Sequence, residues 1–393
     1  MRKMDLEHCL APMRLTEFQE TYWERQPLEI HRTDANYYDN LFSLNDIDSY
    51  LQIARSDPDP TSILIANQKS QPSKDKLLGP SGLVETSLLM KAYTQGDTIV
   101  LNFMHRFWRP LTELCRKWEM FFRHPVAVHA YLTPAGSQAY EPHFDAYDIF
   151  VLQLHGSKKW KLYPALIDSP LPSQARTVDC QQTGELFREV LLEAGDLLYF
   201  PRGWVHEVLT SEKPSLHLSV SVRPYRLVDL VTAAVEAAAF GNPVLRQPLK
   251  TGLLASDCEW DHKNEIQDLM LQIDWQSGLR RLEQRFLSQQ ESLPNAQFAS
   301  LENQTITADT RLSRHPNMLC SAELQPERAT LFFTRNFLRG PANLFPALDF
   351  IARNESFVVR ELPGNLNIES KLVLVRRLVQ EGLLSPIKET EHR

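Results

Sequence analysis

The sequence has few cysteines, and they are widely spaced. Cysteine occurs five times in 393 residues, and no Cys-x-x-Cys pair is present. The odd number and the wide spacing argue against a disulfide framework and against a zinc–thiolate site. The positions are Cys9, Cys115, Cys180, Cys258 and Cys320. We therefore expect a reducing compartment.

Long apolar runs are also missing. No stretch of about 18 consecutive apolar residues occurs, and the first residues lack the apolar core of a signal peptide. The net charge is only −7, and its sign does not favour non-specific binding to nucleic acid. We therefore expect a cytoplasmic protein without a membrane segment.

The remaining composition is that of an ordinary globular protein. Hydrophobic residues make up 43% and charged residues 23% of the chain, so it can bury a substantial core. Its length allows two or three domains.

The first 125 residues predict short elements joined by polar loops. Thr16 and Gln19 have the spacing of a helix capping box. The polar residues 55–60 and 67–82, rich in proline, serine and lysine, are typical of loops. Helices are expected over Ser43–Ala54 and Pro110–Phe122, and strands over Leu28–His31, Ser62–Ala66 and Thr98–Asn102.

Residues 126–224 predict many short strands joined by Pro/Gly turns. Such a series suggests a barrel or jelly roll, the class to which cupins belong. The predicted strands are Val126–Thr133, Ile149–Leu154, Lys158–Tyr163, Asp196–Phe200, Val205–Thr210 and Leu216–Arg223.

After Pro224 the predicted strands give way to helices. Leu227–Phe240 is alanine-rich, 264–289 is amphipathic, and 291–325 is polar and expected to be irregular. The tail predicts helix, strand, helix and strand, an order that resembles a winged helix. These four elements are Phe345–Arg353, Phe357–Leu362, a helix with Ile368, Leu372, Val375 and Val379 on one face, and Leu383–Ile387. The fold class is therefore α+β.

A candidate metal site lies within the strand-rich region. His143 and Asp145 are two residues apart on a predicted strand, so they share a face. His206 follows the tight reversal Pro201-Arg202-Gly203 and arrives from another strand. Two histidines and one carboxylate can form the facial triad of a non-heme Fe(II) oxygenase, with metal positions left open. A lone His-x-Asp is usually a surface pair, but the combination with His206 and a nearby lysine favours the metal site.

That lysine is Lys158. Strand alternation places it on one face with Trp160 and Leu162, whereas Lys159 and Lys161 lie on the other. A lysine in line with apolar residues points inward, where its charge is costly unless it is paired. The carboxylate of a bound acid could pair with it. A lysine that snorkels at a barrel end would give the same pattern, and alternation alone leaves both readings open.

Two predicted strands carry polar stripes. One face of the last strand has His217, Ser219, Ser221 and Arg223, and one face of the first has His129, Tyr131 and Thr133. These stripes suit a barrel that holds a polar ligand. For each strand alone, a solvent-facing side of an antiparallel sheet explains the stripe equally well.

At these residues the chain resembles a known family. AYLTPAGSQAYEPHFDAYDIFVLQLHGSKKWKLY followed by GDLLYFPRGWVHEV looks like the JmjC-type 2-oxoglutarate oxygenases, and is most similar to their ribosomal oxygenase branch. The resemblance implies that His143, Asp145 and His206 bind Fe(II), with 2-oxoglutarate and O2 as co-substrates. Lys158 would hold the distal carboxylate of 2-oxoglutarate.

The resemblance also concerns the pocket beside the metal. Tyr131 and Ser221 fall where the branch has polar pocket residues, and Ser219 lies on the same predicted face as Ser221. His129 is a departure, because the branch has an asparagine there. The resemblance therefore implies that Tyr131, His129, Ser219 and Ser221 lie near the co-substrate, with a changed pocket at His129.

For the whole chain, the resemblance implies three domains and a protein substrate. The three domains are a catalytic JmjC domain over 1–225, a helical dimerisation region over 226–295 and a winged-helix-like domain over 296–393. We expect a homodimer that hydroxylates a side-chain carbon of a polypeptide, a ribosomal protein residue. The alanine-rich helix allows close helix approach, and apolar surface comes from Leu269, Ile273 and Leu279.

Two other functions remain open. The same iron chemistry could act on a peptide natural product or a small metabolite, and a cupin-like protein could bind a partner without catalysis. The intact triad and Lys158 argue against the second of these. Sequence-specific DNA binding is not expected, because Lys371, Arg376 and Arg377 are offset by neighbouring glutamates.

Overall fold

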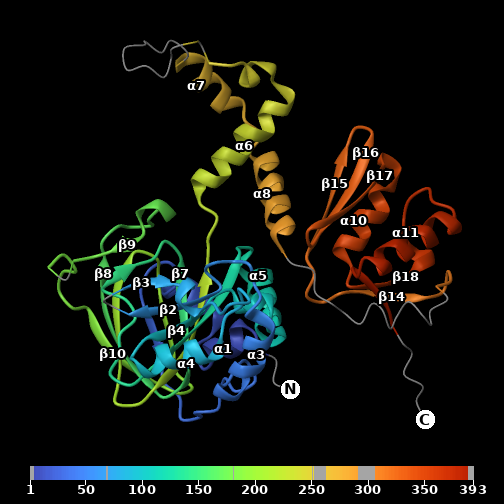
Figure 1. Cartoon of the computed structure of the whole chain (residues 1–393). Helices are drawn as coiled ribbons and strands as arrows, with labels where there is room; N and C mark the ends of the chain where they lie inside the picture. Colours follow the sequence, from blue (N-terminus) through green and yellow to red (C-terminus); the bar gives the residue numbers. More distant parts are fainter. Residues whose placement is uncertain are drawn as a thin grey trace, which may run out of the picture. The chain divides into compact units, whose positions relative to one another are not determined.

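The chain forms two compact units, Met1–Pro224 and Tyr225–Arg393, each described here by itself. Figure 1 shows both in the computed structural model. The structure describes residues 4–67, 70–179, 181–249, 251, 263–290 and 306–387. No helix in this part of the chain combines the length and the apolar character needed to cross a membrane.

The first unit is built on two antiparallel sheets, as a jelly roll requires. The larger sheet has the order β1 (Leu28–Ile30), β11 (Leu197–Phe200), β7 (Asp148–His155), β13 (Ser215–Val222), β5 (Val126–Thr133), β4 (Thr98–Leu101), β2 (Ile63–Asn67) and β3 (Ser70–Ser73). The smaller sheet has the order β10 (Arg188–Glu193), β8 (Ser157–Ala165), β12 (Trp204–Thr210), β6 (His143–Phe144) and β9 (Arg176–Thr177). The six strands predicted between 126 and 224 are all present, with shifts of one or two residues at their ends.

The larger sheet is buried on both faces, which explains the nearly continuous apolar run of β7. Phe150 and Leu152 pack on the outer side with the helices α1 (Leu6–Leu10), α2 (Leu15–Thr21), α3 (Ile47–Ala54), α4 (Thr86–Thr94) and α5 (Arg109–Phe122). Ile149 and Val151 face the smaller sheet and contact the cluster that contains Trp160. The strand β7 is thereby packed between apolar side chains on both faces.

Two local predictions in this unit were wrong, and one predicted helix is present with a different first turn. The helix α2 begins at Leu15 with Arg14 at its N-cap and no side-chain cap, so Thr16 and Gln19 do not form the predicted capping box. The predicted loop over 67–82 contains the strand β3, which pairs with β2. The helix over Ser43–Ala54 starts as a 3-10 turn at Leu44–Asp46 before α3.

The second unit begins with three helices, α6 (Leu227–Gly241), α7 (Lys263–Gln272) and α8 (Trp275–Gln289). α6 and α8 approach closely, because a Cβ on Gly278 would lie 2.7 Å from the Cβ of Ala234. Glu236 on α6 also pairs with Arg281 on α8 at 2.8 Å. The alanine-rich face of α6 therefore packs against α8 of the same chain.

In residues 306–387, the described part of the tail, the second unit has two three-stranded sheets and two α-helices. One sheet has the order β18 (Ser356–Val358), β14 (Arg311–Arg314), β19 (Leu384–Pro386), and the other β15 (Cys320–Gln325), β16 (Arg328–Phe333), β17 (Asn336–Pro341). The helices are α10 (Phe345–Arg353) and α11 (Ile368–Gln380).

Three predictions for the tail need correction. Residues 306–325 are not all irregular, because β14 and β15 lie there; 291–305 fall outside the described residues. The predicted strand Phe357–Leu362 ends at Val358 and continues as a 3-10 turn. On α11 the buried face is formed by Leu374, Val375 and Leu378, and Ile368 is exposed.

Candidate metal centre

A cavity of about 670 Å³ lies between the two sheets of the first unit. Both sheets contribute to its wall, since β5 and β13 line one side and β8 and β12 the other. His143, Asp145 and His206 line the same cavity as Lys158. The candidate metal ligands and Lys158, predicted from separate sequence segments, are thus brought to one cavity.

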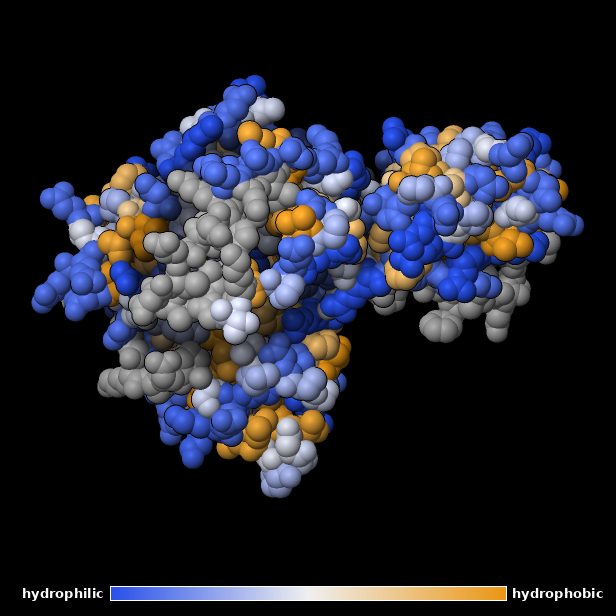
Figure 2. Space-filling model, turned by 90° about the horizontal axis from the view of Figure 1, so that it is seen from above, coloured by the Kyte–Doolittle hydropathy of each residue, from blue (hydrophilic) through white to orange (hydrophobic). Residues whose placement is uncertain are grey.

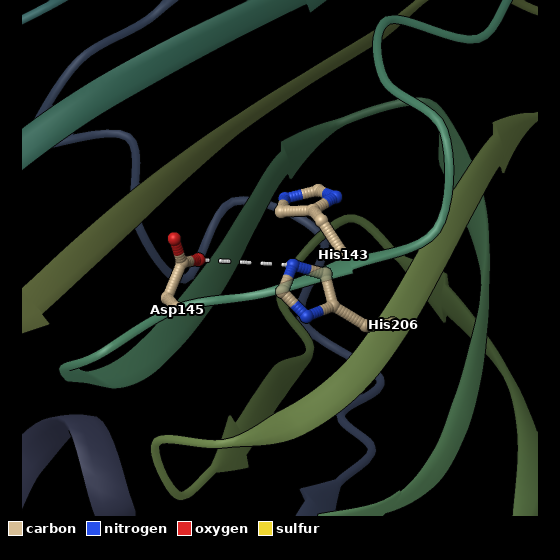
Figure 3. A group of neighbouring side chains, drawn as sticks. All are labelled: His143, Asp145 and His206. Carbon is tan, nitrogen blue, oxygen red and sulfur yellow. Dashed lines mark ion pairs between the residues drawn. The ribbon is translucent and has the colours of Figure 1, made fainter. Parts of the chain in front are cut away.

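The three candidate metal ligands converge because two short strands pair. His143 on β6 is directly opposite His206 on β12, and Asp145 directly follows the last residue of β6. One potential ligand atom from each of the three residues lies within 4.8 Å of the others. Figure 3 shows these side chains pointing toward one another, with His206 Nε2 3.9 Å from Asp145 Oδ2. This spacing leaves room for one metal ion between them.

Both histidines are held in the orientation that a metal site needs. Nδ1 of His143 lies 2.8 Å from the carbonyl oxygen of Glu141, and Nδ1 of His206 lies 3.2 Å from that of Trp204. A carbonyl oxygen only accepts, so Nδ1 of each ring carries a proton and donates it to the main chain. The lone pair of each Nε2 is then free for a metal, the arrangement typical of metal-binding histidines.

The turn before β12 positions the carboxylate ligand. The backbone N–H of Gly203 donates to the carbonyl oxygen of Asp145 at 2.9 Å. Gly203 has φ 84, and a Cβ there would lie 2.2 Å from the carbonyl oxygen of Ile167. Only glycine fits this left-handed, crowded position. The Pro201-Arg202-Gly203 reversal therefore ties the end of β6 to the strand that carries His206.

Burial makes the charged forms of these groups costly. It raises the pKa of Asp145 and lowers the pKa of His206 well below its ordinary value. The hydroxyl of Tyr147 hydrogen-bonds to Asp145, whose charge raises the pKa of Tyr147. A divalent cation would stabilise the carboxylate and the neutral imidazoles together. The donor set therefore fits a bound metal.

Lys158 occupies another part of the same cavity wall. Its side chain is only 3% exposed, and Nζ donates to Oγ1 of Thr133 at 2.9 Å and lies 3.4 Å from Nδ1 of His217. Burial lowers the pKa of Lys158 to about 7. Among the described residues no carboxylate pairs with it. Strand alternation predicted this inward direction correctly, and Lys159 faces out and pairs with Glu189 at 3.0 Å.

The segment that carries these residues matches a known family model. Residues 102–230 match the family model described as the JmjC domain. This segment is a JmjC domain. It contains all three candidate ligands, Lys158 and the strands β5 to β13, and the two sheets to which these strands belong form the cupin-type β-sandwich.

Curated relatives extend beyond the JmjC domain. The chain is 27% identical over 359 residues to "Bifunctional lysine-specific demethylase and histidyl-hydroxylase NO66" of Drosophila erecta, covering 85% of this chain and 54% of that protein. It is 34% identical over 221 residues to "Ribosomal oxygenase 2" of Rattus norvegicus, covering 55% of this chain and 46% of that protein. The chain thus spans about half the length of these two relatives.

Solved structures share the fold over nearly the whole chain. YcfD, a ribosomal oxygenase from Escherichia coli solved with cobalt and 2-oxoglutarate, superposes with a TM-score of 0.58. The match covers 96% of this chain and 99% of that one, at 19% sequence identity. At this identity the likeness establishes the fold.

The other predicted pocket residues of the JmjC domain divide into two groups. Tyr131, His129 and Ser219 line the cavity. Ser221 is fully buried, its hydroxyl donates to the carbonyl oxygen of Ala127 at 3.3 Å, and it is not part of the cavity lining. The structure therefore does not bring Ser221 to the co-substrate position that the resemblance implied.

Four further polar residues matter in the JmjC domain and were not singled out as site residues. Thr133 and His217 contact Lys158, and Tyr147 hydrogen-bonds to Asp145. Oδ1 of Asn102 lies 2.6 Å from Nδ1 of His129. Thr133 and His217 belong to the polar stripes seen in the sequence, so that pattern could have identified them. Asn102 follows the end of β4, where alternation gives no direction for the side chain.

Proposed function

We propose that this chain is an Fe(II)- and 2-oxoglutarate-dependent oxygenase that hydroxylates a side-chain carbon of a ribosomal protein. The observation that carries the proposal is one cavity with three convergent metal ligands and a buried lysine that no carboxylate among the described residues pairs with. Two neutral imidazoles and one carboxylate are the ligand set of non-heme Fe(II) oxygenases. When bound, Fe(II) and 2-oxoglutarate together supply the oxidation of a C–H bond by O2, with succinate and CO2 as co-products.

In this proposal each protein group has a limited task. His143, Asp145 and His206 would hold Fe(II) on one side and leave the other positions open. Their orientation is set in advance by the main-chain carbonyls and by Gly203, so little reorganisation is needed when the metal binds. Tyr147 would keep the Asp145 carboxylate in place.

Lys158 would hold the distal carboxylate of 2-oxoglutarate. A buried ammonium with only a hydroxyl and an imidazole near it gains most from an anionic partner. Pairing would raise the pKa of Lys158 from about 7 and keep it charged. Thr133 would orient the ammonium and offer the distal carboxylate a further polar contact. Tyr131, which stacks on His217 with ring centroids 4.9 Å apart, would close the wall beside it.

A polypeptide substrate is proposed from the relatives and from the second unit. One relative is named a histidyl-hydroxylase and another a ribosomal oxygenase. A hydroxylase of small metabolites needs neither the helices after Pro224 nor the tail sheets. We also propose the domain plan 1–225 catalytic, 226–295 dimerisation and 296–393 winged-helix-like, with a cytoplasmic location and no sequence-specific DNA binding.

The proposed homodimer would use the helices α6 to α8. Leu227, Phe240 and Leu271 are 82%, 73% and 87% exposed within the chain, which is unusual for large apolar side chains. Ile273 is buried and Leu279 is 47% exposed, whereas the side chain of Leu269 lies outside the described residues. Figure 2 shows separate hydrophobic patches among hydrophilic surface on one face of the molecule. Light scattering that gives the monomer mass of 45.3 kDa would reject the dimer.

The enzymatic proposal has a direct test. Purified protein is incubated with Fe(II), 2-oxoglutarate, O2 and ribosomal proteins from cells that lack this gene. We expect succinate formation and a gain of one oxygen atom on one ribosomal protein, and the same protein should lack that oxygen in the deletion cells. If no polypeptide gains oxygen and 2-oxoglutarate is not consumed, the proposed function is wrong.

A further inference from the structure

His129 has a fixed ring orientation on the cavity wall. Its Nδ1 lies 2.6 Å from Oδ1 of Asn102, whose amide nitrogen donates to the carbonyl oxygen of Thr61 at 2.6 Å. Because that amide nitrogen is directed to Thr61, the atom facing His129 is the amide oxygen, which only accepts. Nδ1 of His129 must therefore carry the proton. The neutral ring then has its lone pair on Nε2.

Nε2 lies on the ring edge opposite Asn102. His129 lines the cavity, and within the described residues Nε2 neither contacts a hydrogen-bond partner nor is sealed from solvent. A neutral imidazole nitrogen in this position is a hydrogen-bond acceptor for a group that enters the cavity. The asparagine expected from the family would offer both a donor and an acceptor, whereas His129 offers an acceptor alone.

Positive charge surrounds this acceptor. The ring of Phe103 lies 5.1 Å from that of His129, and its centroid is 4.3 Å from Cζ of Arg106 and 5.9 Å from Cζ of Arg223. Arg106 pairs with Asp59 at 3.0 Å, but no ion pair to Arg223 occurs among the described residues. Burial, and then Arg223, His105 and Arg106, lower the pKa of His129 to about 3. A cationic side chain of a substrate placed at Nε2 would be repelled by the same arginines.

The surrounding backbone holds this arrangement in place. Phe103 has φ 54, a left-handed conformation that a bulky residue rarely adopts, and it directly follows Asn102. The backbone N–H of Asn102 donates to the carbonyl oxygen of Ser62 at 2.7 Å.

Of the two acids that line the cavity, Asp145 is a proposed metal ligand and Glu141 is exposed. No acid in the lining is therefore both buried and available to a cation beside His129.

We propose that His129 determines which side chain this enzyme hydroxylates: its Nε2 accepts a hydrogen bond from an uncharged N–H or O–H of the target residue and disfavours a guanidinium or ammonium group. This inference rests on the proposed function and deepens it. His129 selects the target and is not a metal ligand or a proton-transfer group. An acceptor-only contact in a positive field accommodates an amide, a neutral imidazole or a hydroxyl, and rejects arginine and lysine.

The first experiment identifies the modified residue. In the ribosomal-protein reaction described above, tandem mass spectrometry locates the added oxygen. We expect it on a residue with an uncharged donor. An added oxygen on arginine or lysine overturns the role of His129 and leaves the oxygenase function intact. Absence of any added oxygen together with absence of 2-oxoglutarate consumption rejects the proposed function instead.

The second experiment removes the acceptor and keeps the ring. His129→Phe retains the ring volume and the contact with Phe103 but has no nitrogen. We expect kcat/KM for the protein substrate to fall roughly tenfold to 100-fold, as for the loss of one hydrogen bond in a buried site. The Kd for 2-oxoglutarate should stay within about twofold of the wild type. Lys159→Ala, on the outer face of β8, serves as the control for folding. Unchanged kcat/KM in His129→Phe overturns the inference.

The third experiment requires no substrate. Nitrogen-15 NMR of histidine-labelled protein, loaded with Zn(II) in place of iron, reports the tautomer of each ring, and His129→Phe assigns the relevant signals by their loss. We expect a neutral Nδ1–H form that does not titrate between about pH 5 and 8. An Nε2–H tautomer, or protonation within that range, overturns the inference independently of which protein is hydroxylated.

Discussion

The metal centre and the Lys158 pocket lie in one cavity, but they are built differently. At the metal centre, backbone groups fix each ligand: carbonyl oxygens hold His143 and His206, and the N–H of Gly203 holds Asp145. At Lys158, side chains alone surround a buried ammonium, and no carboxylate among the described residues balances it. The first region is prepared for a cation and the second for an anion. A ligand with a chelating end and a distant carboxylate matches both, and each region can be disabled separately.

The largest effect is expected at the metal centre. His206→Ala removes one of three ligands, and the remaining two cannot hold an ion in an open facial site. We expect loss of stoichiometric Fe(II) binding and a fall in 2-oxoglutarate turnover of at least ~1,000-fold. His155→Ala, at the exposed end of β7, is a matched control and should bind Fe(II) normally. Full turnover in His206→Ala would contradict the assignment of the ligands.

The Lys158 pocket should fail without loss of metal. Lys158→Ala leaves a desolvated carboxylate without its partner, which costs roughly 2–5 kcal/mol by analogy with buried charge pairs. Binding of 2-oxoglutarate should therefore be about 30-fold to several thousand-fold weaker, and Fe(II) binding should persist. Isothermal titration calorimetry under anaerobic conditions measures both.

The neighbouring lysine provides the control for this prediction. Lys159 is exposed and pairs with Glu189 on the outer face of the smaller sheet. Lys159→Ala should change 2-oxoglutarate binding less than about twofold, because exposed ion pairs contribute little. If Lys159→Ala were damaging and Lys158→Ala silent, the assignment of Lys158 to the pocket would be wrong.

The affinity of the Lys158 pocket for 2-oxoglutarate should depend on pH. In the free protein burial lowers the pKa of Lys158 to about 7, and a bound carboxylate raises it. Below pH 7 the ammonium is already protonated, so affinity for 2-oxoglutarate should not depend on this group. Above pH 7 binding requires proton uptake, and affinity should fall by up to roughly tenfold per pH unit until the raised pKa is reached. Affinity that is flat in wild type and in Lys158→Ala alike would show that Lys158 does not titrate.

The smallest effect concerns the hydroxyl that orients Lys158. Thr133→Val keeps the shape of the side chain and removes the acceptor of the 2.9 Å hydrogen bond from Nζ. Loss of one such bond should weaken 2-oxoglutarate binding roughly threefold to tenfold. A weaker effect than that of Lys159→Ala would mean that the hydroxyl has no part in the pocket.

The sequence predicted those parts of the site that follow from strand alternation and turn chemistry. His143 and Asp145 share a face because they are two residues apart, and Lys158 points inward because Trp160 and Leu162 do. Alternation gives a direction relative to the sheet, but not what lies in that direction. Ser221 shares the stripe with His217 and Ser219, yet its hydroxyl meets the backbone of Ala127 in the next strand.

Elements without a strong local pattern could not be predicted. β6 and β9 have two residues each, too few for alternation to be recognised. The edge strand β15 alternates between small and polar residues, such as Ala322 and Glu323, so its sequence is typical of a loop. Its pairing with β16 supplies the hydrogen bonds that its composition does not favour.

The shortness of β6 has a consequence for the unloaded protein. His143 is the residue through which β6 pairs with β12, and the far side of β6 meets only the two residues of β9. A metal bound between His143 and His206 would add a second link between β6 and β12. Part of its binding energy would stabilise the pairing of β6 with β12, because a ligand that binds only the paired form stabilises that form. Amides of residues 143–147 and 176–178 should accordingly exchange hydrogen more slowly in the metal-loaded protein, while β13 at the centre of the larger sheet stays unchanged.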